Sequence, residues 1–338
     1  MARAARSIGK GSIYTRAVFQ DARPFPVIAG PTAGGKSALA LALADAITSA
    51  GGAAEILSAD AFQVYCGMDI GTAKPPPADR ARVPHHLIDI RDPRQPFTVD
   101  DWLRLADPLI DDVRRRGSVP IVVGGTHLYI KALLEGLFDG PPPDEALRAD
   151  LAARTDEHLR DELERVDPIA ASRLHPNDRR RTIRALEVFR QTGRPISDLQ
   201  QQWDRRRRPD ARLIVLDWPA EAINRRINAR VRHMIDAGLV AEARGLYDAG
   251  ALGAQARAAL GYKQLIEHFE GRLSLDDAIE RIKIDTRRFA KNQRTWLRRL
   301  SAAPPSAPAP LTLAAANMPP GALASRVLHE CYCGYGES

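Results

Sequence analysis

The fold class of this 338-residue chain follows from one continuous stretch, Phe25-Pro26-Val27-Ile28-Ala29-Gly30-Pro31-Thr32-Ala33-Gly34-Gly35-Lys36-Ser37. Its first residues are apolar and predict a short buried strand that runs into a glycine turn over residues 25–30. Residues 36–47 are apolar nearly all round, which is typical of a buried helix. Between them, residues 30–37 fit the pattern G-x-x-x-x-G-K-[ST] of a phosphate-binding loop. The stretch therefore predicts a strand, a phosphate loop and a helix in direct succession.

Residues Gly30 to Ser37 are expected to bind a di- or triphosphate. Glycines let successive backbone N–H groups converge on phosphate oxygens, and the start of the helix adds a positive partial charge. Lys36 should reach the terminal phosphate, and Ser37 should ligate Mg²⁺ through its hydroxyl. The alternative, a glycine-rich turn without a ligand, fits the strand–loop–helix setting poorly. The loop does not distinguish between an ATPase, a kinase and a prenyl transferase.

Further apolar runs predict the rest of a sheet. They occupy residues 54–58, 120–123 and 213–216, and segments of helical character separate them. Apolar strands without strict alternation, separated by helices, are typical of a parallel sheet that is covered on both faces. We therefore expect an α/β fold, a P-loop NTPase-like parallel sheet flanked by helices, with an inserted helical domain.

Changes in composition divide the chain into four parts. Residues 1–24 are basic and are expected to form a disordered leader. Residues 25–138 and 209–300 should form the catalytic core with its C-terminal helices. Residues 139–208 begin with a proline break at 141–143, after which the chain is charged and helical in pattern, so we expect an inserted domain there. Residues 301–338 begin rich in alanine and proline, and we expect them to leave the fold as a tail.

The composition limits the class of protein. Hydrophobic residues make up 44% of the chain and charged residues 27%, and no apolar run is long enough to cross a bilayer, so we expect no membrane partner. Cys66, Cys331 and Cys333 are too few for a disulfide framework, which indicates a reducing compartment. We expect a cytoplasmic protein that acts as a monomer.

Polar residues follow two of the predicted strands. Asp60 comes just after the strand at 54–58, and Thr126 follows two glycines after the strand at 120–123. Both should lie at the carboxyl edge of the sheet, where open α/β folds bind their ligands. Asp60 at this position fits either a general base or a Mg²⁺ ligand of an ATPase. Thr126 fits either a substrate contact or a cap of the next helix.

A basic segment lies in the predicted insertion. Between Arg173 and Arg208 there are eleven arginines and four acidic residues, a balance of 11 − 4 = +7 that equals the net charge of the whole chain. Guanidinium groups suit phosphate contacts and stacking on exposed bases. Arg180 and Arg184 are one helical turn apart and share a face. The segment fits either a solvated basic surface, the usual explanation of such a charge run, or an RNA-binding one. Its charge asymmetry together with the family resemblance described next favours the second.

Five further motifs follow the phosphate loop: Ser58–Tyr65, Gly67–Pro75, Val83–Asp89, Val122–Thr126 and Thr286–Gln293. Together with the loop, and in this order, they resemble the tRNA dimethylallyltransferase family over roughly residues 25–300. The resemblance implies transfer of a dimethylallyl group from dimethylallyl diphosphate to N6 of adenosine 37, next to the anticodon. The expected partners are the anticodon stem-loop of tRNA and dimethylallyl diphosphate, with Mg²⁺ as cofactor. The alternative is a P-loop NTPase or a small-molecule kinase.

The resemblance also implies roles for single residues. Asp60 becomes the general base that takes a proton from the exocyclic amine of adenine, and Thr126 hydrogen-bonds the same amine. Arg226 and Arg230 are candidates to clamp the departing diphosphate. Departures from the family include Phe62, which stands where arginine is usual, and His127, which stands where glycine is common. The implied tRNA contacts are Asp60, Ala61, Phe62, Gln63, Thr126, Arg148, Arg180, Arg181, Thr182, Ile183, Arg184, Tyr262 and Lys263.

Overall fold

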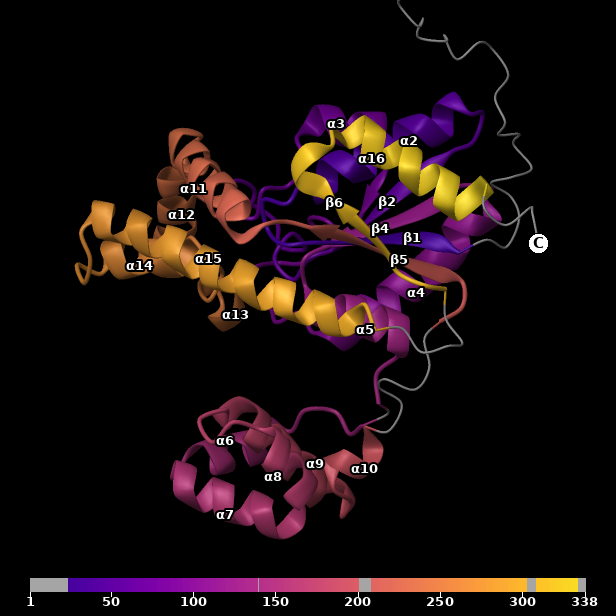
Figure 1. The fold of residues 1–338 in the computed structure, drawn as a ribbon. Helices are drawn as coiled ribbons and strands as arrows, with labels where there is room; N and C mark the ends of the chain where they lie inside the picture. The colour runs from indigo at the N-terminus through magenta and orange to yellow at the C-terminus, as the bar shows by residue number, and fades with distance from the viewer. Residues whose placement is uncertain (1–23, 139, 201–207, 303–307, 334–338) are drawn as a thin grey trace, which may run out of the picture. The chain divides into compact units, whose positions relative to one another are not determined.

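The structure, a computed structural model, describes residues 24–138, 140–200, 208–302 and 308–333 (Figure 1). The expected basic leader lies outside these residues. The described residues form two compact units, one within Glu135–Arg207 and one made from the chain on both sides of that segment. No helix in the described ranges is long and apolar enough to cross a membrane.

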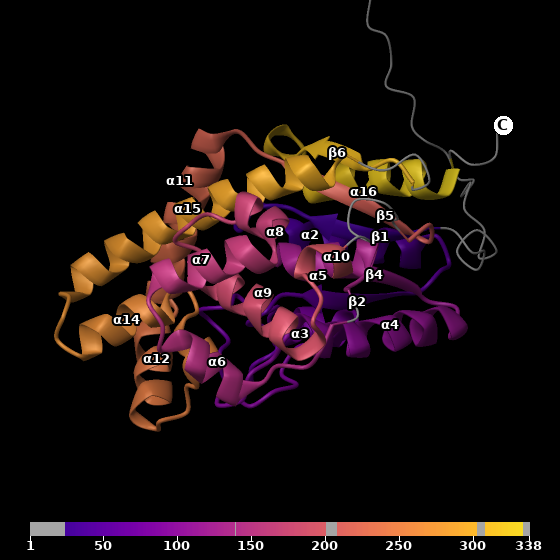
Figure 2. The same cartoon turned by 90° about the horizontal axis from the view of Figure 1, so that it is seen from below.

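A parallel sheet of six strands forms the centre of the larger unit, as far as the structure describes it. The strand order is β3-β2-β4-β1-β5-β6, and Figure 2 shows it from β6 at one edge to β2 near the other. All the pairings are parallel, which confirms the predicted sheet. The strands are β1 (Phe25–Ala29), β2 (Ala54–Ala59), β3 (His85–His86), β4 (Val119–Gly124), β5 (Ala211–Asp217) and β6 (Leu311–Ala314).

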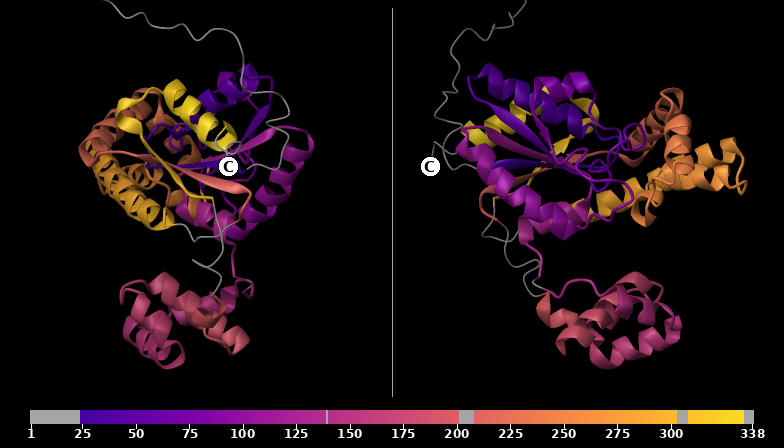
Figure 3. Two further views of the ribbon diagram at one scale, coloured as in Figure 1. Left: turned by 45° about the vertical axis from the view of Figure 1, so that its right-hand side comes forward. Right: turned by 180° about the vertical axis from the view of Figure 1, so that it is seen from behind.

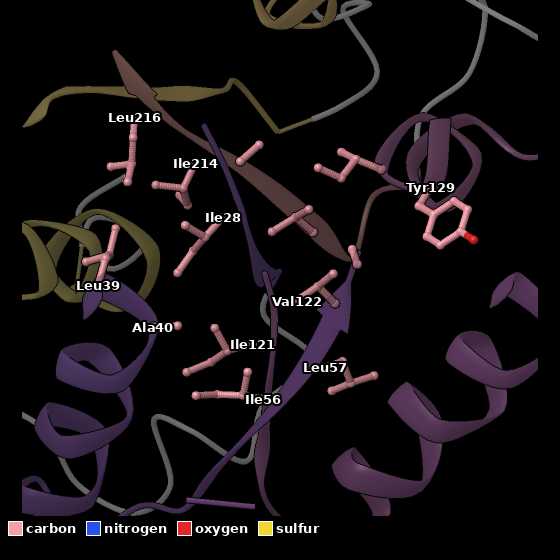
Figure 4. Packing of buried hydrophobic residues seen from close by; sticks show 14 of the residues in the cluster. Ile28, Leu39, Ala40, Ile56, Leu57, Ile121, Val122, Tyr129, Ile214 and Leu216 are labelled. Carbon is pink, nitrogen blue, oxygen red and sulfur yellow. The ribbon is translucent and has the colours of Figure 1, made fainter. Parts of the chain in front are cut away.

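The core of this unit packs on both faces of the sheet. Successive side chains of a strand point to opposite faces. In Figure 4, Ile56 lies on the side of Leu39, whereas its neighbour Leu57 lies on the side of Tyr129. Each fully buried aliphatic side chain stabilises the fold by about 1.5–3 kcal/mol relative to an exposed one. The helices of this part of the unit are α2 (Lys36–Ser49), α3 (Pro77–Arg82), α4 (Val99–Arg115) and α5 (His127–Glu135).

A group of helices lies beyond the carboxyl ends of the strands (Figures 1 and 3). The longest, α15 (Leu275–Leu300), begins after Ser274, whose hydroxyl accepts a hydrogen bond from the backbone N–H of Asp277 at 3.1 Å. Its apolar face packs against α11 and α14. The other helices of the group are α11 (Ala220–Asp236), α12 (Leu239–Asp248), α13 (Ala254–Arg257) and α14 (Tyr262–Phe269).

The segment after residue 301 was expected to leave the fold, and that expectation is wrong for residues 311–333. Strand β6 pairs with β5, and the helix α16 (Pro320–Leu328) packs on α2. Leu311 and Leu313 are buried and alternate with exposed residues, which is the period of a strand. Cys331 is also buried, and burial raises the pKa of its thiol to about 11. The apolar–polar alternation extends over only four residues, which is too short to predict a strand in a segment that begins rich in alanine and proline.

The smaller unit is a helical bundle with its own core. Its helices α7 and α9 pack against each other around Leu159, Leu163 and Leu186. Helix α9 begins after Asp178, whose carboxylate accepts a hydrogen bond from the backbone N–H of Arg181. The helices are α6 (Glu145–Ala152), α7 (Asp156–Val166), α8 (Pro168–Arg173), α9 (Arg179–Thr192) and α10 (Ile196–Leu199).

Candidate functional site

The phosphate loop connects β1 to α2 and lines a cavity of about 510 Å³. Residues from Thr32 to Ala38 form its wall, so the helix N-terminus opens into it. Gly30 and Pro31, the first two residues of the loop, do not line the cavity. The Pro31 carbonyl accepts hydrogen bonds from the Gly34 N–H at 3.0 Å and from Lys36 Nζ at 2.9 Å. The local sequence thus builds the loop that it predicted.

Lys36 lies in this cavity in a strongly positive environment. Burial, helped by the nearby Arg230 guanidinium and opposed by Asp60, lowers the pKa of the Lys36 ammonium to about 8. Burial also lowers the pKa of Arg230, with Asp60 opposing and Arg226 contributing. Such shifts mean that the free protein holds these cations at an electrostatic cost. An anion in the cavity would relieve that cost.

Helix α11 supplies two arginines to the same cavity. Arg226 Nε donates to the carbonyl of Ala33 at 2.8 Å, and its guanidinium lies 4.7 Å from the ring centroid of Trp218. Trp218 Nε1 in turn donates to the carbonyl of Gly34 at 3.0 Å. Arg230 lies one turn further along and lines the cavity as well. Neither arginine forms an ion pair within the described residues, so both remain available to an anion.

Asp60 follows β2 and carries an oriented carboxylate. Its Oδ1 accepts hydrogen bonds from the backbone N–H groups of Phe62 at 2.9 Å and Gln63 at 3.3 Å. Within the described part of the chain, its Oδ2 has no hydrogen-bond partner. The carboxylate is therefore held by one oxygen and can accept a proton or a hydrogen bond with the other.

Thr126 lies beside Asp60 because β2 and β4 approach closely at their ends. A Cβ on Gly124 would lie 2.1 Å from the carbonyl oxygen of Ala59, so only glycine permits this approach. The Thr126 hydroxyl accepts a hydrogen bond from the backbone N–H of Ala61 at 3.0 Å. It contacts the segment that carries Asp60 instead of capping α5, which removes one of the two alternatives for this residue.

A second cavity, of about 430 Å³, adjoins the first. Its wall is largely apolar and comes mainly from α11, from residues 258–261 and from α15. Asp60, Arg230, Thr32, Thr72 and Phe289 line both cavities. Asp60 therefore lies where a cationic cavity meets an apolar one. The apolar wall includes Phe62, Ile227, Val231, Met234, Leu239 and Ile282.

Gln293 is a site residue to which the sequence assigned no role. It is buried in α15; its Oε1 accepts from the Thr32 N–H at 2.7 Å and its Nε2 donates to the Gly125 carbonyl at 2.9 Å. One amide thus joins the phosphate loop to the end of β4. The available signal was a glutamine on the otherwise apolar face of a long amphipathic helix.

His127 fills the position where glycine is common in the family. Its ring stacks on Trp296 with centroids 5.5 Å apart and an interplanar angle of 16°. Burial, together with the charge of Lys36, lowers the pKa of His127 to about 4, so the imidazole is neutral near pH 7. The residue lines the apolar cavity, where a neutral aromatic ring fits the surroundings.

The expected RNA contacts in the smaller unit divide into exposed and engaged side chains. Arg180 and Arg181 are exposed, and Arg181 also pairs with the carboxylate of Asp178 at 2.5 Å. Arg184 and Arg148 both form ion pairs with the buried Glu187, at 2.6 Å and 2.9 Å. Their guanidinium groups therefore have a structural partner inside the unit. The same pairs hold the pKa of Glu187 below its usual value although burial raises it.

Two further expected contacts lie in α9. The Thr182 side chain is buried, and its hydroxyl donates to the carbonyl of Asp178 at 3.0 Å. Ile183 packs against the core of the smaller unit. Neither side chain is presented for base or phosphate contacts in this structure.

Tyr262 was expected to be available to RNA, and the structure contradicts this. Its side chain is fully buried, and its hydroxyl donates to Glu242 Oε1 at 2.5 Å. The reason is that α14 packs against α12 and α15, a contact that local sequence does not reveal. The neighbouring Lys263 is exposed.

The fold and the site define a P-loop α/β protein with a cationic pocket, an aspartate and a threonine at one edge of the sheet. Residues 63–300 match the family described as IPP transferase. The tRNA dimethylallyltransferase of Geobacillus kaustophilus is 50% identical over 277 residues, which cover 80% of this chain and 86% of that relative. The chain belongs to the tRNA dimethylallyltransferase (IPP transferase) family.

Solved structures agree with this assignment. The tRNA isopentenylpyrophosphate transferase of Bacillus halodurans is 36% identical with a TM-score of 0.61, covering 91% of this chain and 99% of that one. A eukaryotic dimethylallyltransferase acting on tRNA is 29% identical with a TM-score of 0.70, covering 81% and 70%.

Proposed function

We propose that this enzyme transfers the dimethylallyl group of dimethylallyl diphosphate to N6 of adenosine 37, next to the anticodon of tRNA. The observation that carries the proposal is the position of Asp60 where the cationic and the apolar cavities meet. A diphosphate suits the first cavity, and a prenyl chain and an extruded base suit the second. The reaction needs a proton acceptor at the place where these groups join.

The cationic cavity is proposed to hold the leaving group. As the bond between C1 of the prenyl group and oxygen breaks, the electron pair goes to the diphosphate. Lys36, Arg226 and Arg230 would stabilise that charge, together with the backbone N–H groups of the phosphate loop. An otherwise repulsive cluster of cations becomes favourable only when the diphosphate is bound.

Asp60 and Thr126 are proposed to activate the amine. The N6 lone pair is delocalised into the adenine ring, so the amine is a weak nucleophile. As the N6–C1 bond forms, the free Oδ2 of Asp60 would take the proton. The Thr126 hydroxyl already accepts one hydrogen bond from Ala61 and can accept a second from the amine. The apolar cavity would keep water, a competing nucleophile, away from C1.

Mg²⁺ fits the residues of the cationic cavity. Ser37 lines it and offers a hydroxyl oxygen, a hard ligand, although the described residues contain no cluster of three or more acidic, histidine or cysteine side chains. Mg²⁺ commonly binds through one or two protein oxygens and substrate phosphates. When bound, it would neutralise charge on the diphosphate.

The exposed arginines Arg180 and Arg181 in the smaller unit and Lys263 in the larger unit are proposed to contact tRNA phosphates. Arg148 and Arg184 are proposed to act more weakly, since both already pair with Glu187. We propose a monomer as the active form.

Nucleoside analysis of bulk tRNA tests the proposed reaction. Cells that lack this protein should lose N6-(dimethylallyl)adenosine and its derivatives, and expression of the chain should restore them. An equal content of the prenylated nucleoside in both strains would exclude the proposal. ATP hydrolysis by the purified protein without tRNA would instead favour a P-loop NTPase.

The affinity for dimethylallyl diphosphate should depend on pH through Lys36. The ammonium form binds the anion, and the pKa of Lys36 in the free protein is lowered to about 8. Affinity should therefore be constant near pH 7 and fall by up to about tenfold per pH unit above 8. Titration calorimetry from pH 7 to 9.5 measures this, and Lys36→Arg should remove the dependence. A constant affinity for the unmodified protein across that range would contradict the assignment.

A further inference from the structure

The segment Asp69–Lys74, here the 69–74 segment, forms part of the wall of both cavities. Thr72 lines both of them, Gly71 lines the apolar one and Ala73 the cationic one. The Lys74 ammonium links the end of the segment to its start, since it donates to the carboxylate of Asp69 at 2.6 Å. It also donates to the carbonyl of Tyr65, just before the segment, at 2.6 Å. The position of this segment therefore affects the space in which the reacting groups meet.

One carboxylate from α12 holds the first half of the segment. Glu242 accepts hydrogen bonds from three successive backbone N–H groups, those of Asp69 at 3.0 Å, Ile70 at 2.8 Å and Gly71 at 3.1 Å. Successive backbone N–H groups that converge in this way form an anion-binding concavity. Glu242 has no cationic partner within the described residues, so the segment itself compensates its charge.

Tyr262 completes the arrangement from α14. Its hydroxyl donates to Glu242 at 2.5 Å, and its buried ring lies against Gly71. A Cβ on Gly71 would lie 2.4 Å from Cε2 of that ring, so the segment can pack here only with glycine. The carboxylate thus receives four hydrogen bonds, and two helices fix the segment.

The second half of the segment connects to Asp60 through Gln63. The side chain Nε2 of Gln63 donates to the carbonyls of Thr72 and Ala73, both at 3.2 Å, and its Oε1 accepts from Ser58 Oγ at 2.8 Å. Its backbone N–H donates to Asp60 Oδ1 at 3.3 Å. A continuous set of hydrogen bonds therefore runs from Glu242 through the 69–74 segment and Gln63 to the carboxylate of Asp60.

We propose that Glu242 and Tyr262 are positioning residues for the transfer reaction, which hold the 69–74 segment in place and through it orient Asp60. The proposal rests on the function of Asp60 proposed above. Neither residue lines either of the two cavities. Their removal should change the rate of transfer more than the affinity for the diphosphate, because Lys36 and Arg226 are held by the carbonyls of Pro31 and Ala33.

Glu242→Gln and Tyr262→Phe test the proposal. The introduced amide would place a donor against the backbone donors of the 69–74 segment, so kcat should fall about 10- to 100-fold, the size expected for a small displacement of a reacting group. Tyr262→Phe keeps the ring on Gly71 and removes one hydrogen bond, so kcat should fall about three- to tenfold. In both variants KM for dimethylallyl diphosphate should stay within about threefold. Asp248→Asn, an exposed carboxylate on the same helix, is the matched control and should leave both constants unchanged.

Hydrogen exchange separates this role from a general effect on folding. The backbone amides of residues 69–71 should exchange faster in both variants, while those of β1 and β4 keep their protection. A kcat within twofold of the unmodified enzyme in Glu242→Gln, with faster exchange at residues 69–71, would overturn the proposal while leaving Asp60 as the base. Should Glu242→Gln fail to fold, Tyr262→Phe decides on the same two readouts. If Asp60→Asn kept its activity while Glu242→Gln lost it, the role of Asp60, and with it the proposed connection, would be wrong.

Discussion

Asp60→Asn should lower kcat for prenyl transfer by about 10²- to 10⁴-fold, the range of a general base, and leave tRNA affinity within about twofold. Asparagine has nearly the same shape, and its carbonyl oxygen can still accept from the backbone N–H groups of Phe62 and Gln63. It cannot take the proton that N6 must lose. Single-turnover prenylation and filter binding of tRNA measure the two effects separately.

The same variant distinguishes a base from a metal ligand. If Asp60 were chiefly a Mg²⁺ ligand, the loss would appear as weaker binding of the diphosphate and would shrink as Mg²⁺ is raised. As a base, Asp60 leaves that affinity largely intact, and added Mg²⁺ restores nothing. Asp111→Asn, an exposed aspartate on α4, is the matched control. A near-normal kcat in Asp60→Asn would refute the assignment.

Lys36→Ala should weaken dimethylallyl diphosphate binding by about 10²-fold or more, because it removes a desolvated charge that contacts the anion. The folded protein should not lose stability from this change. Burial and Arg230 lower the pKa of Lys36 to about 8, so its charged form still predominates near pH 7 but is less stable in the free site than it would be in water. We therefore expect an unchanged or higher melting temperature together with the loss of binding.

Calorimetric titration with dimethylallyl diphosphate and a thermal unfolding scan check both halves of this expectation. Arg225→Ala is the matched control, because Arg225 is an exposed cation on α11 that does not line the cationic cavity. Undiminished affinity in Lys36→Ala would exclude the phosphate loop as the diphosphate site. A large drop in melting temperature would show that Lys36 is instead a structural residue.

Lys36→Ala is thus expected to lose diphosphate binding without losing stability. This combination is typical of a binding site whose charges are stabilised only when the ligand is bound. Lys36, Arg226 and Arg230 repel one another in the free protein, and their shared purpose appears only with an anion. Stability and function thus oppose each other at these positions. Asp60 moderates the repulsion, which is a second consequence of its place at the edge of the cationic cavity.

Much of the site was predictable because it is encoded locally. The strand, the loop and the helix of residues 25–49 are contiguous, so hydrophobic pattern and glycine spacing suffice to predict them. Asp60 and Thr126 follow strands, and parallel strands bring their carboxyl ends to one edge of a sheet. Their proximity was therefore expected before any contact was known.

Other features depend on residues that are far apart in the chain. Gln293 hydrogen-bonds Thr32 across 261 positions, and Tyr262 is buried only because three helices converge on it. The pairing of Arg148 with Glu187 likewise depends on how α6 and α9 pack. A run of arginines looks the same in sequence whether its charges face solvent or a buried acid.

The fold class and the chemistry could be predicted from residues 25–37 and from the positions of Asp60 and Thr126 at strand ends. The reason is that short-range patterns encode strands, turns and helix starts. Packing settled the rest. It joined β6 to the sheet, removed Tyr262 from the RNA surface and placed Asp60 where two cavities meet. Burial and long-range hydrogen bonds arise from the assembled fold, and no local stretch of the chain contains them.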